Sequence, residues 1–241
     1  MDFLDSLLNA PLWNWTGLPA LSSFAARIDG IIGWVTVLVG FWFIVTEFVL
    51  FYFAIKYRKQ NAPKAAYITG EEPELKRWIS RPHNIVLLFD VFIVIIGVRV
   101  WVDVKMELPP EPLPHVRVVA QQWAWSFVHP GPDGLLDTAD DIKTVDDLHI
   151  QSNQQYIWEL ESRDVLHSFS IPAMRLKQDA VPGRVIKGYF DANAVGVYEI
   201  QCAEICGIGH GLMPAKVHVE DAAAHLGWMQ AHAPATQIAA N

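Results

Sequence analysis

Two long apolar runs dominate the first half of the 241-residue chain and limit what it can fold into. Residues 31–57 are almost wholly apolar, and as a helix these 27 residues would extend about 40 Å. Residues 85–102 form a second run of 18 residues, about 27 Å as a helix, which is at the lower limit for crossing a bilayer. Hydrophobic residues make up 52% of the chain, which is high for a soluble protein. The sequence therefore predicts two membrane-spanning helices, 31–57 and 85–102.

The charges beside these runs predict how the helices are oriented. The segment 1–30 has one basic residue, Arg27, whereas seven lie between the two runs or at the end of the first: Lys56, Arg58, Lys59, Lys64, Lys76, Arg77 and Arg81. Because cytoplasmic loops carry the excess of Lys and Arg, we expect the connecting loop 58–84 in the cytoplasm and both ends of the chain outside. The segment 1–30 also lacks the basic start of a secretory signal, so we expect no cleaved signal peptide.

The second half of the chain has a different character. Residues 103–111 predict a stiff linker, because the stretch from Met106 to Pro114 is rich in proline. From 112 to 220, short β-type runs alternate with turns rich in Asn, Pro, Gly and Asp, which is typical of an antiparallel sandwich. These runs are 116–128, 147–150, 156–162, 185–192, 196–201 and 215–220. Residues 221–241 predict a short helix over 221–233 and a C-terminal tail.

Charge excludes one class of function and suggests a partner. The formal net charge is −8, whereas a nucleic-acid-binding domain normally presents a basic face. A basic soluble partner fits this charge better than a nucleic acid does.

Three ionisable residues lie within or near the apolar runs: Glu47, Asp90 and Arg99. Such groups are expensive in lipid and usually face protein or water. We therefore expect these side chains to contact a partner protein in the membrane.

Six potential metal ligands occur in the second half of the chain: His167, Cys202, Glu204, Cys206, His210 and Met213. Thiolate, imidazole and thioether donors together suit soft or borderline metals, and copper above all uses His, Cys and Met in one site. Glycines at 207, 209 and 211 let the loop between the cysteines and Met213 fold tightly. A mononuclear blue-copper site needs only one thiolate. The two cysteines therefore indicate a dinuclear copper site that carries electrons.

Two other uses of the cysteines remain open. A zinc site of the Cys2His2 type would use both histidines but would not require Met213. A local disulfide between Cys202 and Cys206 would leave the histidines and Met213 as ordinary residues. Copper is favoured because three further soft ligands lie at this spacing.

Three motifs resemble subunit II of cytochrome c oxidase: residues 165–169 (VLHSF), 179–184 (DAVPGR) and 201–214 (QCAEICGIGHGLMP). The resemblance is close over 112–220 and looser over the apolar runs. It implies a helical hairpin of two transmembrane helices, followed by an all-β, cupredoxin-like Greek-key sandwich. It also implies that Cys202 and Cys206 bridge two copper ions, to which His167 and His210 each contribute one ligand.

The resemblance assigns roles to three more residues. Met213 would be a weak axial ligand of one copper, and the backbone carbonyl of Glu204 would complete the other. The carboxylate of Glu204 would reach a magnesium ion at the interface with subunit I, as suits a hard cation. Trp123 would take electrons from cytochrome c. Ala124 interrupts the aromatic triplet that is usual at this place, so a different c-type haem donor is the alternative.

The implied function is that of subunit II of a proton-pumping cytochrome c oxidase. Electrons from cytochrome c would pass through the copper centre to haem in subunit I, where O2 is reduced to water. The chain would be a multi-pass protein of the inner (cytoplasmic) membrane, with its copper domain on the periplasmic side and with subunit I and other oxidase subunits as partners. Two alternatives remain open: the copper subunit of a nitric oxide reductase, and a membrane-anchored copper chaperone.

An acidic stretch, residues 131–141 (GPDGLLDTADD), resembles a calcium loop in the spacing of its acids. It lacks the full spacing and the terminal Glu of an EF-hand. A solvated acidic hairpin is therefore favoured over calcium at Asp133–Asp141. Together with Asp146 and Asp147, this stretch could steer a basic cytochrome toward the domain.

Overall fold

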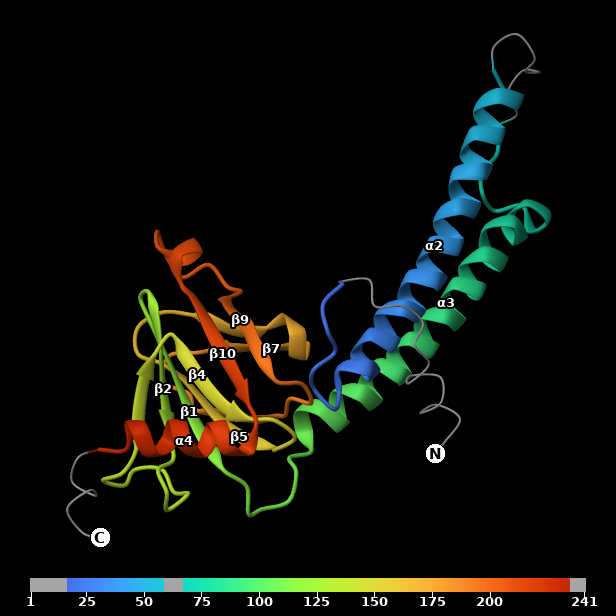
Figure 1. Ribbon diagram of the computed structural model, residues 1–241. Coiled ribbons are helices and arrows are strands. Elements are labelled where there is room, and N and C mark those ends of the chain that lie inside the picture. The colour runs from blue at the N-terminus through green and yellow to red at the C-terminus, as the bar shows by residue number, and fades with distance from the viewer. Residues whose placement is uncertain (1–16, 59–66, 235–241) are drawn as a thin grey trace. The chain divides into compact units, whose positions relative to one another are not determined.

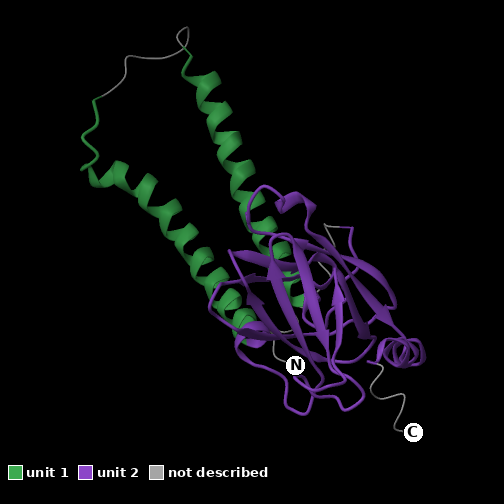
Figure 2. Cartoon of the chain, turned by 90° about the vertical axis from the view of Figure 1, so that its left-hand side faces the viewer, with its two compact units in different colours: residues 1–13, 27–102 green, residues 14–26, 103–241 purple. Residues whose placement is uncertain are grey.

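The computed structural model describes residues 17–58 and 67–234 and divides into two compact units, which Figure 2 colours separately. Among the described residues, unit 1 comprises 27–58 and 67–102, and unit 2 comprises 17–26 and 103–234. The remainder of the predicted N-terminal segment 1–30, loop 58–84 and C-terminal tail lies outside the described residues, at 1–16, 59–66 and 235–241.

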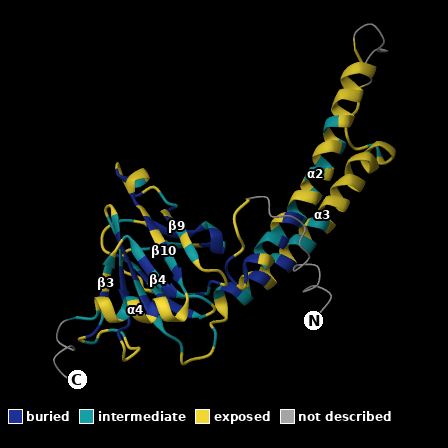
Figure 3. Cartoon of the chain, in the orientation of Figure 1, coloured by how far each residue is buried: buried dark blue, intermediate teal, exposed yellow. Residues whose placement is uncertain are grey.

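Unit 1 consists of two long apolar helices, α2 (Ala25–Lys56) and α3 (Pro73–Trp101), and a π-helical turn, Val102–Met106, continues α3. Both helices are long and apolar enough to cross a membrane. Their side chains are mostly exposed, as the yellow ribbon in Figure 3 shows. The two helices pack against each other through edge-to-face rings, with Trp34 against Phe92 and Trp42 against Phe89. The predicted pair of apolar helices is confirmed.

Helix α3 begins at Pro73, well before the apolar run that starts at Ile85. Proline is favoured in the first turn of a helix, where its missing N–H would have no partner. The carboxylate of Glu72 accepts hydrogen bonds from the backbone N–H groups of Thr69 and Gly70 and so fixes the turn that leads into the helix. Three basic residues of the predicted loop therefore lie on the exposed first part of α3: Lys76, Arg77 and Arg81.

Unit 2 is a sandwich of two five-stranded sheets, and most of its labelled strands can be followed in Figure 1. The first sheet has the order β3 (Ile142–Val145), β2 (Ala124–His129), β1 (His115–Gln121), β5 (Tyr156–Ser162) and β8 (Ile186–Phe190). The second has the order β4 (Asp147–Gln151), β10 (Pro214–Glu220), β9 (Gly196–Cys202), β6 (His167–Ile171) and β7 (Leu176–Ala180). The pairs β1/β5 and β4/β10 are parallel, and the other neighbours are antiparallel. The predicted cupredoxin-like, all-β class of this domain is confirmed.

The core between the sheets is built from large aromatic and aliphatic side chains. Trp125, Phe127, Trp158 and Phe169 are essentially inaccessible to solvent. Leu21 of the N-terminal segment is also fully buried in this core, and its backbone N–H donates to the carbonyl of Ala173 (2.9 Å). A short piece of chain from before α2 thus completes the sandwich.

Helix α4 (Ala222–His232) lies beside β4 and β10 and confirms the helix predicted over 221–233. Its Trp228 stacks on His149 of β4, with ring centroids 4.2 Å apart, and His149 in turn stacks on His218 of β10 at 4.4 Å. One carboxylate, that of Glu220, contacts Nδ1 of both His149 (2.8 Å) and His225 (3.0 Å). The helix is therefore held against the sheet by a group of titratable rings.

His129 lies at the inner edge of this group and is 3% exposed. The backbone N–H of His149 donates to its Nε2 (3.0 Å), so this nitrogen carries no proton, and its Nδ1 faces the carbonyl of Ile142 (3.3 Å). Burial lowers the pKa of His129 from an ordinary value of 6.5 to about 3. The folded domain therefore holds His129 neutral under conditions in which an unfolded chain would charge it.

We expect the stability of unit 2 to fall as the pH decreases from about 6.5 toward about 3, because only the unfolded chain then takes up a proton at His129. The contribution of His129 is fully present above pH 6.5, and its loss amounts to about 1.4 kcal/mol per pH unit well below that value. Urea unfolding of the detergent-solubilised chain, followed by tryptophan fluorescence at several pH values, measures this slope. In His129→Gln the free energy of unfolding should depend less steeply on pH, by the equivalent of one proton taken up on unfolding. The control His232→Gln should keep the slope of the unaltered chain. Equal slopes in all three proteins would disprove the assignment.

Candidate metal centre

The sheet register brings the first two candidate ligands together. Strands β6 and β9 pair with Phe169 opposite Cys202, and the backbone N–H of Ala203 donates to the carbonyl of Ser168 (2.9 Å). His167 is the first residue of β6 and Cys202 is the last residue of β9, so both stand at the same end of the sandwich. Their side chains are buried, and Nδ1 of His167 lies 3.9 Å from Sγ of Cys202.

The loop between β9 and β10 returns the other donors to the same place. Sγ of Cys206 lies 3.7 Å from Sγ of Cys202, and Nδ1 of His210 lies 3.6 Å from Sγ of Cys206. Gly207 has a φ of +126°, a conformation that side-chain-bearing residues rarely adopt, and its carbonyl accepts the backbone N–H of His210 (3.1 Å). The tight turn at Gly207 therefore folds His210 back toward Cys206.

The distance between the two sulfur atoms distinguishes the possible uses of the cysteines. A disulfide requires about 2.05 Å, and both Cys202 and Cys206 are unbonded thiols here. Two thiolates bound to one ion at about 2.3 Å each in roughly tetrahedral geometry would lie about 3.8 Å apart, close to the 3.7 Å observed. Burial, together with the neighbouring Cys202 sulfur, raises the pKa of the Cys206 thiol to about 11. A bound cation is therefore what would keep this sulfur as a thiolate near neutral pH.

The placement of the two imidazoles favours two ions over one. Ligand atoms of His167, Cys202 and Cys206 lie within 4.8 Å of one another, but His210 does not belong to that group. A single tetrahedral zinc ion would need all four donors around one point. Instead, His167 lies beside one sulfur and His210 beside the other. The donors fit a copper pair with two shared sulfurs better than a Cys2His2 zinc site.

Two further candidate residues, Glu204 and Met213, lie close to this cluster. The backbone carbonyl of Glu204 is 3.2 Å from Sγ of Cys202, and the Glu204 side chain is partly exposed. Met213 is 2% exposed in the same core cluster as the cysteines, and its carbonyl accepts a long hydrogen bond from Nε1 of Trp125 (3.4 Å). The Glu204 carbonyl oxygen is thus near one sulfur and Met213 is buried in the same core, while the roles of both residues as ligands stay predictions.

Trp123 lies against the loop that carries the donors, and its ring is 38% exposed. A side-chain carbon at Gly209 would come within 2.4 Å of the indole, and one at Gly207 within 3.2 Å, so the ring rests directly on the backbone of these glycines. The preceding residue, Gln122, donates from Nε2 to the carbonyl of Cys206 (2.8 Å). Trp125, in contrast, is fully buried and is part of the core.

Substitution of Gly209 by alanine is expected to push Trp123 off the loop, because the new methyl group would overlap the rigid indole rather than the end of a flexible chain. We expect a red-shifted or altered tryptophan signal and a severalfold slower reduction of the metal-loaded chain by a reduced c-type cytochrome. Stopped-flow spectroscopy measures the rate. Gly211→Ala is the matched control, because nothing lies within 4 Å of the position of its added carbon. Equal rates in both variants would show that the position of Trp123 has no influence.

The structure adds a residue that the sequence alone did not single out, Asp164. Its Oδ1 lies 2.9 Å from Nε2 of His167, and its carboxylate also accepts the backbone N–H groups of Gln122 (2.7 Å) and Val165 (2.6 Å). Burial alone would raise the pKa of Asp164, but these hydrogen bonds outweigh it and lower that pKa. A proton on Nε2 leaves the Nδ1 lone pair of His167 free on the side that faces Cys202. The signal available in the sequence was a carboxylate three residues before a candidate ligand.

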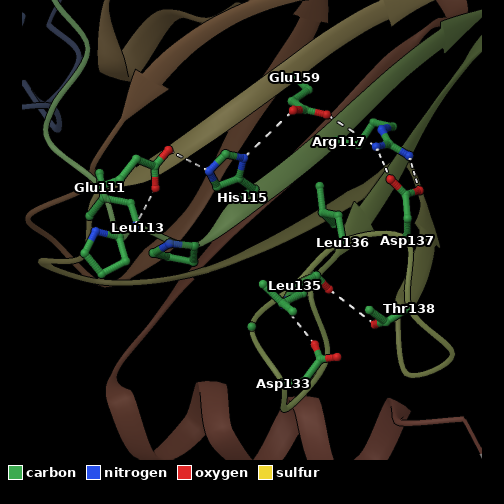
Figure 4. Close-up of a pocket in the computed structure, with 13 residues that line it drawn as sticks. Glu111, Leu113, His115, Arg117, Asp133, Leu135, Leu136, Asp137, Thr138 and Glu159 are labelled. Carbon is green, nitrogen blue, oxygen red and sulfur yellow. Dashed lines mark hydrogen bonds and ion pairs between the residues drawn. The ribbon is translucent and has the colours of Figure 1, made fainter.

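The acidic stretch 131–141 lies at the other end of the sandwich, because strand β2 begins next to Trp123 and runs away from it to His129. The stretch helps to form an open pocket of about 690 Å³, shown in Figure 4, in which Asp137 makes a two-point ion pair with Arg117 (2.7 and 2.8 Å). Arg117 also contacts Glu159 (3.3 Å). The acids at 133–141 are therefore not part of the surface around Trp123. Asp146 does belong to that surface. Its backbone N–H donates to the carbonyl of Trp125, and its carboxylate accepts the backbone N–H of Trp125.

The comparisons with known proteins agree with this arrangement. A family model described as the periplasmic domain of cytochrome c oxidase subunit II matches residues 136–220, which contain all six candidate ligands. The alternative cytochrome c oxidase subunit 2 of Bradyrhizobium diazoefficiens is 28% identical over 241 aligned positions, which cover 90% of this chain and 83% of that protein. The chain is a subunit II-like protein. A second subunit 2, from Cereibacter sphaeroides, is 24% identical and covers 93% of this chain and 82% of that protein.

Among solved structures, the periplasmic domain of subunit II of the cytochrome oxidase of Bradyrhizobium japonicum aligns with a TM-score of 0.46 and 23% identity. The alignment covers 52% of this chain and 96% of that structure. The similarity to these oxidase subunits implies a part in an oxidoreductase complex and assembly with other oxidase subunits. Its two apolar helices, together with a domain that matches a periplasmic-domain family, fit a membrane-anchored subunit.

Proposed function

We propose that this chain is the electron-input subunit of a respiratory cytochrome c oxidase. A c-type cytochrome on the outer face of the membrane would donate electrons at Trp123, and the electrons would leave through a dinuclear copper centre toward haem in subunit I, where O2 is reduced to water. The observation that carries the proposal is the pair of unbonded sulfurs, Cys202 and Cys206, 3.7 Å apart and each flanked by its own histidine.

The chain's own side chains define how the centre would be held. Cys202 and Cys206 would share both copper ions, His167 and His210 would each bind one, and Met213 and the carbonyl of Glu204 would complete them. A bound copper pair supplies reversible one-electron chemistry with little change of geometry. His167 has no exposed surface and Cys206 is 3% exposed, so the protein keeps water away from the donors. Because these donors are little exposed and their positions are fixed, the reorganisation energy of electron transfer would be small.

The surface around Trp123 supports a docking role. The loop on which this ring rests exposes three aliphatic side chains: Ile205, Ile208 and Leu212. Exposed apolar residues grouped in this way mark contact surfaces for other proteins. Asp164 and Asp146 add negative charge at the same end of the domain, which would attract a basic donor over several ångströms.

The carboxylate of Glu204 is the proposed contact with a magnesium ion at the interface with subunit I. The side chain is partly exposed beside Cys202, where a partner subunit would be able to reach it. Magnesium suits such a place because it uses few protein ligands and keeps several waters.

The membrane arrangement is part of the same proposal. Helices α2 and α3 would cross the inner membrane, with the basic segment between them in the cytoplasm and the sandwich on the periplasmic side. The nitric oxide reductase alternative is not favoured, because the matching relatives are described as cytochrome c oxidase subunits. A copper chaperone is also disfavoured, because a metal-exchange site should be accessible, whereas His167, Cys202, Cys206 and Met213 are buried and His210 is only partly exposed.

The spectrum of the full-length chain tests the proposal. The detergent-solubilised protein, loaded with copper, should be purple and should show a mixed-valence EPR signal with hyperfine structure from two equivalent copper nuclei. Addition of a reduced c-type cytochrome should bleach the colour without release of copper to a chelator. A colourless protein, or copper that passes to the chelator on reduction, would contradict an electron-carrying role.

A further inference from the structure

Helix α4 is attached to the sandwich mainly by aromatic and titratable rings rather than by an aliphatic stripe. Most of its side chains are exposed, as Figure 3 shows, and its buried residue is a histidine, His225. Leu226, its one leucine, is 51% exposed. The helix touches β2, β4 and β10 through the rings of His225 and Trp228. Because a surface helix normally packs through a stripe of apolar residues, little apolar burial opposes the release of α4.

Trp228 lies in the middle of a stack of rings. On its inner side the indole is parallel to His149 of β4, with ring centroids 4.2 Å apart, and His149 is parallel to His218 of β10 at 4.4 Å. On the helix itself, His232 stacks on the indole at 5.1 Å. Every ring of this stack except the indole is able to take up a proton near or below neutral pH. Protonation of both His149 and His218 would place like charges on adjacent rings and so oppose the stack.

His129 lies beside the stack, and its hydrogen bonds exclude a second proton while α4 is in place. The indole of Trp228 meets its ring edge to face at 4.9 Å. Its Nε2 accepts the backbone N–H of His149 (3.0 Å), and its Nδ1 faces the carbonyl of Ile142 (3.3 Å). A proton on Nε2 would set two donors against each other and break this link between β2 and β4. Protonation of His129 therefore requires this part of the domain to open.

The charged groups around His129 and His149 come from three elements. The carboxylates among them favour a charged ring, but burial dominates at both histidines and lowers both pKa values from 6.5. A group with a lowered pKa stabilises the closed form above pH 6.5, and this contribution is lost as the pH falls below that value. The neighbours are Asp147 on β4, His218 and Glu220 on β10, and His225 and His232 on α4.

We propose that α4 is a proton-sensitive switch: on acidification it leaves the sheet while the sandwich stays folded, and His129 and His149 take up the protons. The chain joins α4 to the sheet at Asp221, directly after β10, so the helix can swing away without loss of strand pairing. Its release exposes the outer face of β4 and β10 around His149 and His218. The switch does not depend on the proposed copper centre, because none of its residues is a candidate ligand.

Hydrogen exchange of the full-length, detergent-solubilised chain tests the switch, because it measures local opening separately from global unfolding. The exchange rate of the peptide that contains α4 is divided by its intrinsic rate at each pH. Protection of α4 should fall about tenfold or more from about pH 5.5 to about pH 4.5, while β6 and β9 stay protected. Constant protection of α4 over this interval would overturn the switch. Simultaneous loss of protection in α4, β6 and β9 would overturn it as well, since the whole domain would then be unfolding.

A substitution at His129 tests whether this ring takes up a proton. His129→Gln keeps an acceptor for the N–H of His149 but cannot be charged, so α4 should lose about tenfold less protection over the same interval. The matched control is His115→Gln, which removes a ring on β1 that contacts Glu111 (2.9 Å) outside the stack. It should behave as the unaltered chain does.

A second variant, His149→Gln, keeps the test decisive if His129→Gln does not fold. It should also weaken the dependence of α4 protection on pH, because the stacked ring that gains a proton on opening is then absent. Protection of β6 and β9 at neutral pH shows which variants are folded. A dependence on pH that is the same in the unaltered chain and in each folded variant would overturn the proposal.

Discussion

Replacement of Cys206 by serine is expected to abolish the dinuclear copper centre completely. The two sulfurs lie 3.7 Å apart and would be shared by both ions, so loss of one removes a ligand from each. A serine hydroxyl is not a thiolate donor near neutral pH and does not suit a soft metal. The purple colour and the mixed-valence EPR signal should disappear, and any copper that remains should give the signal of a single isolated ion. Copper content and EPR of the purified chain measure both effects.

The control for this variant is Ile205→Ser, which places the same residue in the same loop at a side chain that is 77% exposed. It should bind copper as the unaltered chain does. The pair also separates copper from the other uses of the cysteines. A structural disulfide would make the copper spectrum of both proteins equally absent, and a zinc site would leave both without a copper-specific signal. A delocalised spectrum that survives in Cys206→Ser would exclude the shared-sulfur arrangement.

The sequence was sufficient to nominate most of the side chains that gather in the candidate metal centre, because most of them lie in one short segment. Cys202, Cys206 and His210 come from the loop between two strands, and a loop of this length with a positive-φ glycine returns on itself whatever the rest of the fold does. His167 could be nominated from its residue type and motif alone. Its position beside Cys202 depends on the pairing of β6 with β9, which is a long-range contact.

The strands that were missed show where local pattern carries too little information. β6 is buried on both faces, so it lacks the alternation that predicts a strand, and β7 is largely polar. β3 has four residues and no apolar repeat. The run 116–128 was read as one strand because its turn at Gln122 and Trp123 contains neither glycine nor proline, whereas the structure makes two strands of it.

The extent of α3 has a similar physical cause. Hydrophobicity predicts only the part of a helix that must be apolar to lie in lipid, here 85–102. The helical backbone itself can continue into polar residues beyond that part. Residues 73–84 are polar and helical, so they were assigned to the loop.

Asp164 was not singled out from the sequence, and its removal is expected to weaken copper binding about 10–100-fold. The carboxylate holds Nε2 of His167 at 2.9 Å and so directs Nδ1 toward Cys202. In Asp164→Ala the imidazole is free to rotate or to exchange tautomers, and the backbone N–H of Gln122 loses its acceptor as well. Asp164→Asn, which keeps one acceptor oxygen, should retain most of the affinity. Competition with a copper chelator of known affinity measures the change.

The effect of Asp164 should arise through His167 rather than through charge alone, and a second carboxylate tests this. Glu199 is exposed on β9, the strand that leads to Cys202, and Glu199→Ala removes the same charge without touching His167. Simple electrostatic attraction of copper would make Glu199→Ala and Asp164→Ala similar, and would make Asp164→Asn as weak as Asp164→Ala, since both lose the charge. If Asp164 acts by positioning the imidazole, Asp164→Asn should bind copper more tightly than Asp164→Ala. The copper EPR parameters should then change in Asp164→Ala alone. Because the same carboxylate binds the backbone next to Trp123, that variant should also accept electrons more slowly from a reduced c-type cytochrome, even after copper is fully loaded.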